Sequence, residues 1–330
     1  MLEQPTTELN SSFIPNSVHK IYFKDSQCMK EVLDKNVHLV VTSPPYWNIK
    51  DYGHPEQIGY RDDLEEYLAK LDNVWSECIR VLAPGCRLCI NIGDQYLRAN
   101  STENKPYQII PLHAYLVNHI MQRHIDNVIY LGSIIWNKIP TTKTSGGASV
   151  MGSYGFPRNG YVSYNYEYIA IFKKKIGKGE TEPKPKPEIK QKAFINLSQW
   201  RELFNGIWSF NDKSDTEQKA SINQSQLIED FNIIWSFNGA RQVNHVATFP
   251  DELPKRLMQM FTYEGDTVLD PFLGSGTTTK VALELGRNSI GYEIGFKSPN
   301  LDDTIKVIKE KIHFDDVPTE LRKKVFPTLS

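Results

Sequence analysis

Two short polar segments, each directly after an apolar run, carry the residue types in this chain that could do chemistry. The first is Thr42-Ser43-Pro44-Pro45-Tyr46-Trp47, which follows Leu39-Val40-Val41. The second is Asp270-Pro271-Phe272-Leu273-Gly274-Ser275-Gly276-Thr277-Thr278-Thr279, which follows Thr267-Val268-Leu269. Each pattern predicts a buried strand that ends in a tight loop with a polar tip.

The first loop has the groups that a primary aromatic amine needs around it. Its two prolines fix φ and lack N–H donors, so the backbone carbonyls are held in a rigid arrangement. The Ser43 hydroxyl and the Pro44 carbonyl can accept the amine protons, and Tyr46 can stack on a base brought out of a helix. Transfer of a methyl group to such an amine is a single in-line displacement that depends mainly on positioning. We therefore take Ser43, Pro44, Pro45 and Tyr46 as the candidate catalytic residues.

The second loop predicts a ligand site where a strand turns into a helix. Gly274 and Gly276 allow the backbone to approach a ligand closely, and the helix N-terminus favours a carboxylate. Phosphate-binding alternatives fit less well. A P-loop requires lysine where Thr277 stands, and the dinucleotide fingerprint requires glycine where Thr279 stands. Glu293, at the end of the next predicted strand, can accept hydrogen bonds from ribose hydroxyls.

The apolar periodicity along the chain alternates between strand and helix. This predicts an α/β fold with a doubly wound, mostly parallel sheet that brings the two loops together. The predicted strands are 20–23, 37–41, 88–92, 130–136, 166–172, 267–269 and 289–292. The predicted helices are 28–34, 64–82 (stopped by Pro84-Gly85), 111–123, 249–261 and 277–285.

Residues 173–240 interrupt this alternation. Residues 173–192 are rich in Lys, Glu and Pro, which predicts an extended excursion. Farther on, Asn205-Gly206-Ile207-Trp208-Ser209-Phe210-Asn211 is echoed by Asn232-Ile233-Ile234-Trp235-Ser236-Phe237-Asn238. We interpret the echo as a local duplication within an inserted region.

Composition limits the other functions of the 330-residue chain. The net charge is −1, but residues 137–192 contain 11 basic and 4 acidic residues, which is typical either of a polyanion-facing surface or of a solvated loop. No run approaches the roughly 20 apolar residues of a membrane span, and no signal peptide is evident. The four cysteines include Cys86-x-x-Cys89 but no second pair, so we expect buried thiols and no metal site.

In combination, these segments resemble the beta-class amino-methyltransferases of prokaryotic restriction-modification systems. The resemblance covers roughly residues 18–172 and 232–300, with the catalytic half first, so that the motif order is circularly permuted. It implies a seven-stranded Rossmann-like sheet with S-adenosylmethionine as cofactor. The resemblance includes the segments 24–26, 91–94, 134–138, 166–172 and 245–253. The implied cofactor-binding residues are Asp25, Ser26, Thr42, Phe249, Pro250, Leu253, Asp270, Pro271, Phe272, Gly274, Ser275, Gly276, Thr277 and Glu293.

The resemblance also implies a division of the chain and a set of partners. Residues 1–172 would form the catalytic half, 173–240 an inserted target-recognition region, and 241–330 the cofactor-binding half. Double-stranded DNA is the expected partner, contacted by Trp47, Lys138, Lys143, Arg158 and Tyr161. We expect a monomer or homodimer in the cytoplasm of a prokaryote, associated with the nucleoid through DNA, with a cognate restriction endonuclease as a further partner.

The residue before Pro-Pro-Tyr bears on the target base. In this family Ser at that position is usual for N4 of cytosine and Asp for N6 of adenine, with exceptions, so Ser43 favours N4-cytosine and leaves N6-adenine as the alternative. Two further functions remain open. One is methylation of a protein or RNA amine, where related loops have Asn before Pro-Pro-Tyr. The other is a catalytically silent DNA-binding subunit, against which the intact Ser43, Tyr46, Asp270 and Gly274 argue.

Overall fold

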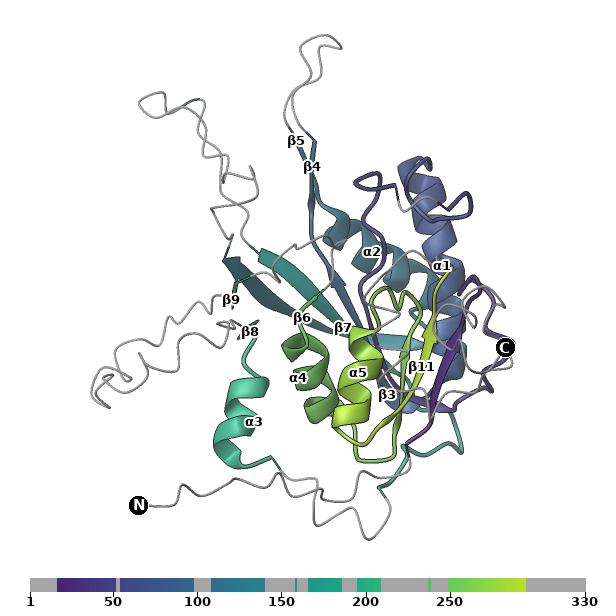
Figure 1. The fold of residues 1–330 in the computed structure, drawn as a ribbon, viewed down its shortest axis with the longest axis vertical. Helices are drawn as coiled ribbons and strands as arrows, with labels where there is room; N and C mark the ends of the chain where they lie inside the picture. The colour runs from purple at the N-terminus through teal and green to yellow at the C-terminus, as the bar shows by residue number, and fades with distance from the viewer. Residues whose placement is uncertain are drawn as a thin grey trace, which may run out of the picture.

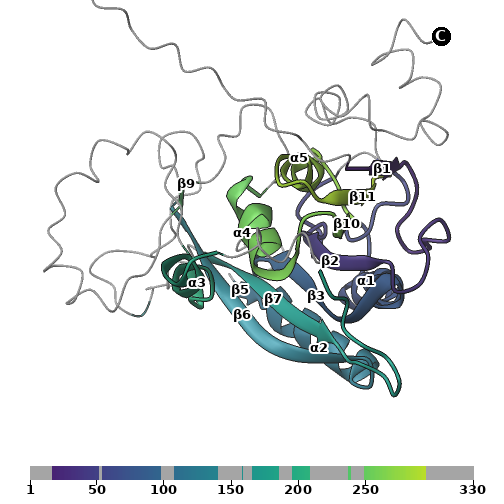
Figure 2. The same ribbon diagram turned by 90° about the horizontal axis from the view of Figure 1, so that it is seen from below.

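A mixed nine-stranded sheet runs through the chain, with helices against both of its faces (Figures 1 and 2). The computed structural model describes residues 17–51, 54–97, 108–139, 158, 166–185, 195–208, 237–238 and 249–294. The strands, in spatial order, are β1 (His19–Tyr22), β11 (Asn288–Tyr292), β10 (Thr267–Asp270), β2 (Val37–Thr42), β3 (Leu82–Ile92), β7 (Tyr166–Lys174), β6 (Val128–Ile139) and β8 (Ile207–Trp208), and β9 (Phe237–Asn238) also pairs with β6.

The strand directions confirm the predicted doubly wound, mostly parallel sheet. Neighbours from β1 to β3 are parallel, β7 is antiparallel to both β3 and β6, and β8 and β9 run parallel to β6. All seven predicted strands form. Strands β10 and β11 lie between β1 and β2, so segments that are far apart in the sequence build one half of the sheet together.

The helices form two covering layers, one on each face of the sheet (Figure 2). Helices α1 (Leu64–Val81) and α2 (Leu112–His124) share one apolar cluster with the sheet. Helices α4 (Glu252–Phe261) and α5 (Thr277–Glu284) share the other. Several short elements were not predicted. They are the helix α3 (Leu197–Leu203), the ladder of β4 (Gln95–Leu97) with β5 (Gln108–Ile110), and the strands β8 and β9, which bring the predicted seven-stranded sheet to nine.

Local sequence explains where α1 begins. Asp63 caps the helix by accepting from the Glu66 N–H at 2.8 Å, and the Glu66 carboxylate accepts from the Asp63 N–H in return. Its end lies within one residue of the predicted Leu82. The helix stops at Val81 because Leu82 is already extended and begins β3, so the predicted stop signal Pro84-Gly85 lies inside that strand.

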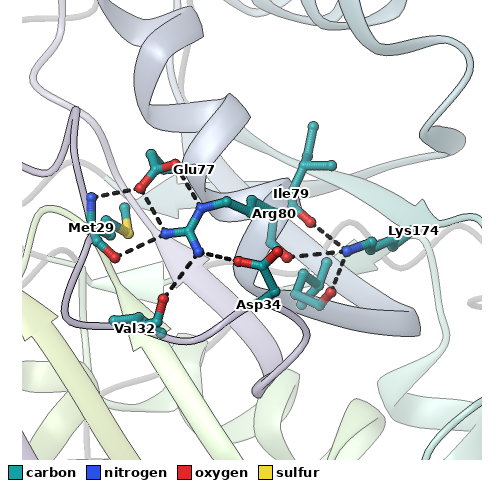
Figure 3. A network of polar contacts seen from close by, with 8 residues as sticks. Met29, Val32, Asp34, Glu77, Ile79, Arg80 and Lys174 are labelled. Atoms are coloured by element: carbon teal, nitrogen blue, oxygen red, sulfur yellow. Dashed lines mark hydrogen bonds and ion pairs between the residues drawn. The ribbon is translucent and has the colours of Figure 1, made fainter.

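The helix predicted over residues 28–34 is wrong, since this segment consists of turns. Its backbone is held by two side chains of α1 instead of by its own ladder (Figure 3). The Glu77 carboxylate accepts from the Met29 N–H at 2.6 Å, and Arg80 donates to the Met29 and Val32 carbonyls and to the Asp34 carboxylate. Helical periodicity was present, but these long-range contacts satisfy the same backbone groups in another way.

The region predicted to be an insertion, residues 173–240, is only partly described, and residues of both echo segments pair with the strand β6. Ile207 and Trp208 of the first copy pair with Ile135 and Trp136 of β6, and residues 237–238 of the second copy pair with residues 138–139. Counted along the repeated Ile-Trp-Ser-Phe-Asn pattern, the two copies therefore meet β6 in the same register. Trp208 is fully buried and donates from its indole N–H to the Leu203 carbonyl at 2.9 Å.

Part of the predicted basic stretch turns toward the protein itself. The Lys174 ammonium donates to the carbonyls of Ile79, Arg80 and Leu82, and burial lowers its pKa. Glu182 lies 3.4 Å from Arg87. Lys174 and Glu182 thus serve the end of α1 and the start of β3, which removes these two charges from the candidate DNA surface.

The Arg80 network gives a test of how the turns at 28–34 are held. The Glu77 carboxylate, whose pKa is lowered chiefly by its hydrogen bond from Arg80, and two backbone carbonyls all depend on one planar guanidinium. We expect Arg80→Lys to lower the free energy of unfolding by about 1–3 kcal/mol, measured by urea denaturation. Arg123→Lys is the matched control, because Arg123 is exposed and reaches Asp72 only at 3.4 Å. Equal effects of the two changes would contradict this account.

Candidate active site

The two polar loops leave the sheet side by side. Strands β2 and β10 are parallel neighbours in which Val40 pairs with Leu269. At their ends the Thr42 hydroxyl donates to the Asp270 carboxylate at 2.8 Å, across 228 positions of sequence. Ser43 and Pro271, the next residues of each strand, therefore begin their loops at the same rim of the sheet.

Asp270 braces the second loop from inside. It is 1% exposed and accepts from the Thr278 hydroxyl at 2.6 Å and from the Phe272 N–H at 3.1 Å, besides Thr42. Burial raises the pKa of this carboxyl to about 6, although these hydrogen bonds pull it downward. Asp270 thus links the end of β2, the turn after β10 and the first turn of α5.

The glycine turn before α5 has the features of a ligand cradle. Gly274 and Gly276 have φ values of +55° and +82°, which favour glycine, and a Cβ built on Gly274 would meet only the Phe272 carbonyl, at 3.9 Å. No side-chain hydrogen bond caps α5 at Gly276. The helix N-terminus can therefore receive a ligand carboxylate of the kind that S-adenosylmethionine carries.

The ends of β11 and β1 lie next to this turn and carry two acidic side chains. The Glu293 carboxylate accepts from the Gly274 N–H at 2.8 Å, and the Glu293 N–H donates to the Tyr22 carbonyl at 3.0 Å. Asp25 accepts from both the backbone and the side chain of Gln27. Ser26 is buried. A carboxylate in the Glu293 position fits a ribose diol, and the site fits an adenosyl amino acid in its chemistry.

The remaining predicted cofactor residues occupy different depths. Phe249 and Pro250 are half-buried before α4, whereas Leu253, in the first turn of that helix, is fully buried in the core. Pro271 is buried and Thr277 is half-buried. A buried group such as Leu253 can shape the site only through its neighbours.

The first loop is held from beneath by polar contacts. The Tyr67 hydroxyl of α1 donates to the Pro45 carbonyl at 2.8 Å, and the Trp47 indole N–H donates to the Asp62 carbonyl at 2.8 Å. Trp47 also packs against the cluster under α1. The loop that carries Ser43 and Tyr46 is thereby rigid on its protein-facing side.

Behind Tyr46 lie two buried polar side chains to which sequence analysis assigned no role. The Asn91 amide donates to the Glu167 carboxylate at 2.8 Å and to the Tyr46 hydroxyl at 3.3 Å. Asn91 is the last residue but one of β3 and Glu167 is the second residue of β7, and they are only 3% and 8% exposed. The available signal was one polar residue within each of two apolar strands, Leu88–Ile92 and Tyr166–Phe172.

The predicted DNA contacts are the least described part of the site. Arg158 is exposed, and Lys138 is described only through its backbone in β6. Lys143 and Tyr161 lie outside the described residues, so their role stays a prediction. No group of three or more metal-ligating side chains, and no helix long and apolar enough to cross a membrane, occurs among the residues described.

A parallel sheet with a glycine cradle at one strand end and a Ser-Pro-Pro-Tyr loop at its neighbour defines the class of amino-methyltransferases. The sequence profile of the N6/N4 DNA methylase family matches residues 37–297. The chain therefore belongs to the DNA methylase family of N6 and N4 amino-methyltransferases.

Relatives that align with almost the whole chain agree with this assignment. The chain is 33% identical to the type II methyltransferase M.MjaI of Methanocaldococcus jannaschii over 90% of its own length and 94% of the relative's. It is also 33% identical to the type II methyltransferase M.MthZI of Methanothermobacter thermautotrophicus, covering 89% of this chain and 79% of that protein.

Solved structures match the fold. A putative DNA modification methylase of Thermus thermophilus, in complex with S-adenosyl-L-methionine, is 27% identical with a TM-score of 0.59, covering 90% of this chain and 99% of that one. The cytosine-N4-specific PvuII DNA methyltransferase matches with a TM-score of 0.55 over 94% of this chain and 92% of its own. Since that identity is 17%, the second match speaks for the fold alone.

The raised pKa of Asp270 predicts how it affects stability. In the unfolded chain this carboxyl titrates near 4. Between about pH 4 and 6 the folded protein therefore binds more protons than the unfolded chain, so the contribution to stability is lost as pH rises through about 6. Asp270→Asn cannot titrate. We expect the free energy of unfolding of the wild type, relative to this variant, to fall by about 3 kcal/mol from pH 4 to 7 in urea titrations. Parallel pH curves for the two proteins would refute this.

Proposed function

We propose that this chain transfers the methyl group of S-adenosylmethionine to the exocyclic amine of a base in a specific double-stranded DNA sequence, and that the base is cytosine, methylated at N4. The supporting observation is the Thr42–Asp270 contact, which sets the Ser43 loop and the Gly274 turn at adjacent strand ends. A donor held by one loop then faces an acceptor held by the other.

The residues of the two loops have separate tasks in this proposal. Gly274, Gly276 and Glu293 hold the cofactor, which supplies an electrophilic methyl group on a sulfonium. Ser43 and the Pro44 carbonyl accept the amine protons, so that the nitrogen lone pair leaves ring conjugation and points at the methyl group. Tyr46 supplies an aromatic surface for a base extruded from the duplex, because a paired amine is out of reach.

The choice of cytosine rests on Ser43, which stands where adenine-specific relatives of this class usually have Asp. N6 of adenine is the alternative, since either side chain can accept from either amine. Methylation of a protein or RNA amine is disfavoured by Ser43 and by the long region 173–240. We assign that region to target recognition, residues 1–172 to the catalytic half and residues 241–330 to the cofactor half.

The proposal extends to the cellular setting. DNA is reached by Trp47, Lys138, Lys143, Arg158 and Tyr161 in a protein that acts as a monomer or homodimer in the prokaryotic cytoplasm, on the nucleoid. A restriction endonuclease that cuts the same sequence is the expected companion. Methylation of that sequence would then protect the DNA from this endonuclease.

The decisive experiment is modification-sensitive sequencing of DNA from cells that express the chain. We expect one short sequence to carry N4-methylcytosine at a single position, with the unmodified host as control. N6-methyladenine in a defined sequence would move the target to the alternative base. Tritiated methyl transfer to protein or RNA, but not to duplex DNA, would refute the proposal.

The division of tasks predicts two opposite phenotypes. Ser43→Ala and Tyr46→Ala should lose turnover by about 100-fold or more with unchanged cofactor affinity, because both side chains lie on the base side. Glu293→Gln should instead weaken S-adenosylmethionine by about 10- to 100-fold, because a charged acceptor for two hydroxyls becomes neutral. Isothermal titration and steady-state kinetics separate the two. Loss of cofactor binding in Ser43→Ala would invalidate the division.

A further inference from the structure

Glu167 is a buried carboxylate placed directly behind the proposed catalytic loop. In the antiparallel pair of β3 and β7, Ile92 lies opposite Tyr168, so Glu167 stands one step beyond, beside Gly93. A Cβ built on Gly93 would lie 2.9 Å from the Glu167 side chain and 3.3 Å from the Tyr46 ring. Only glycine at this position leaves room for the two side chains to approach each other.

Hydrogen bonds join Glu167 to the loop. The Tyr46 hydroxyl bonds to both Ser43 and Glu167, and Asn91 donates to both Tyr46 and Glu167. Burial and the neighbouring Glu167 carboxylate raise the pKa of Tyr46 well above its usual range, which keeps the phenol protonated. Tyr46 is therefore a permanent donor in this network.

The chemistry of these groups gives this series of hydrogen bonds a direction. A carboxylate can only accept and a phenol has one proton, so Tyr46 donates to Glu167 and must accept from Ser43. The Ser43 proton is then committed to Tyr46, and the serine oxygen turns its lone pairs toward the target amine. Each hydrogen bond polarises the next, so the buried charge makes Ser43 a better acceptor than an isolated hydroxyl.

We propose that Glu167 is the terminal proton acceptor of a relay that runs from the target amine through Ser43 and Tyr46, with Asn91 holding the carboxylate in place. In the reaction the bond between the base nitrogen and the methyl carbon forms while the sulfonium carbon–sulfur bond breaks, leaving a neutral thioether. The amine proton passes to the Ser43 oxygen, the Ser43 proton to Tyr46 and the Tyr46 proton to Glu167. This inference rests on the proposed function and names one more residue for the same site.

The test uses the full-length protein and a duplex with the mapped recognition sequence. Glu167→Gln keeps the size of the side chain and an acceptor for Asn91, but it cannot take up a proton. We expect its single-turnover methylation rate to fall about 100-fold or more, while the dissociation constants for S-adenosylmethionine and DNA are unchanged. When 2-aminopurine replaces the target base, its fluorescence should still rise as it is extruded from the duplex. Glu182→Gln is the matched control, because the Glu182 carboxylate contacts Arg87 near the other end of β3.

Glu167→Ala provides an independent arm that also serves if Glu167→Gln fails to fold. We expect sodium formate to restore its methylation rate by at least about tenfold, and to leave Ser43→Ala inactive. A Glu167→Gln rate within about threefold of wild type would overturn the relay. So would a Glu167→Ala enzyme that formate cannot rescue and that no longer extrudes the base, because Glu167 would then only support the loop. A wild-type protein that methylates no DNA would refute the proposed function itself, which keeps the two failures distinct.

Discussion

The hydrogen bond from Thr42 to Asp270 is the contact on which the rest of the site depends. It ties the ends of two parallel strands that the chain reaches 228 positions apart, and both of its side chains are buried. A buried carboxylate is costly unless its oxygens are satisfied, and here two hydroxyls and one backbone N–H satisfy them. The cost of burial favours this pairing of the strands, because a slip in register between β2 and β10 would take the Thr42 hydroxyl away from the buried Asp270 carboxylate.

The same physics recurs one strand away. Asn91 and Glu167 place an amide and a carboxylate in an otherwise apolar pair of strands, and Tyr46 connects them to the rim of the sheet. Such groups weaken a core unless they are paired, and here the Asn91 amide nitrogen is bonded to the Glu167 carboxylate and to the Tyr46 hydroxyl. Asn91 and Glu167 lie behind Ser43, and this position supports the proposed relay. A buried charge acts on a neighbouring hydroxyl far more strongly than a solvated charge does.

The edge of the sheet shows a different constraint. Strand β6 is paired on one side by β7 and on the other by short pieces of both echo segments. An edge strand needs cover for its backbone groups, and a duplicated segment is one way to supply it. The fully buried Trp208, with the Arg256 guanidinium over its ring at 5.7 Å, anchors the first of these pieces to α4.

Much of this protein could be predicted because its elements are locally consistent. Apolar runs of strand length, the capping box at Asp63 and the glycines at 274 and 276 each specify their own conformation from nearby residues. The seven strands, the parallel character of the sheet and the pairing of the two loops followed from these. The turns at residues 28–34 did not, because the groups that hold them, Glu77 and Arg80, lie almost fifty positions away. The sequence by itself thus determined the strands, the loops and the class of chemistry. Only the tertiary structure decided that Asn91 and Glu167 lie behind Tyr46, because the pairing of β3 with β7 is a long-range event that no local pattern encodes.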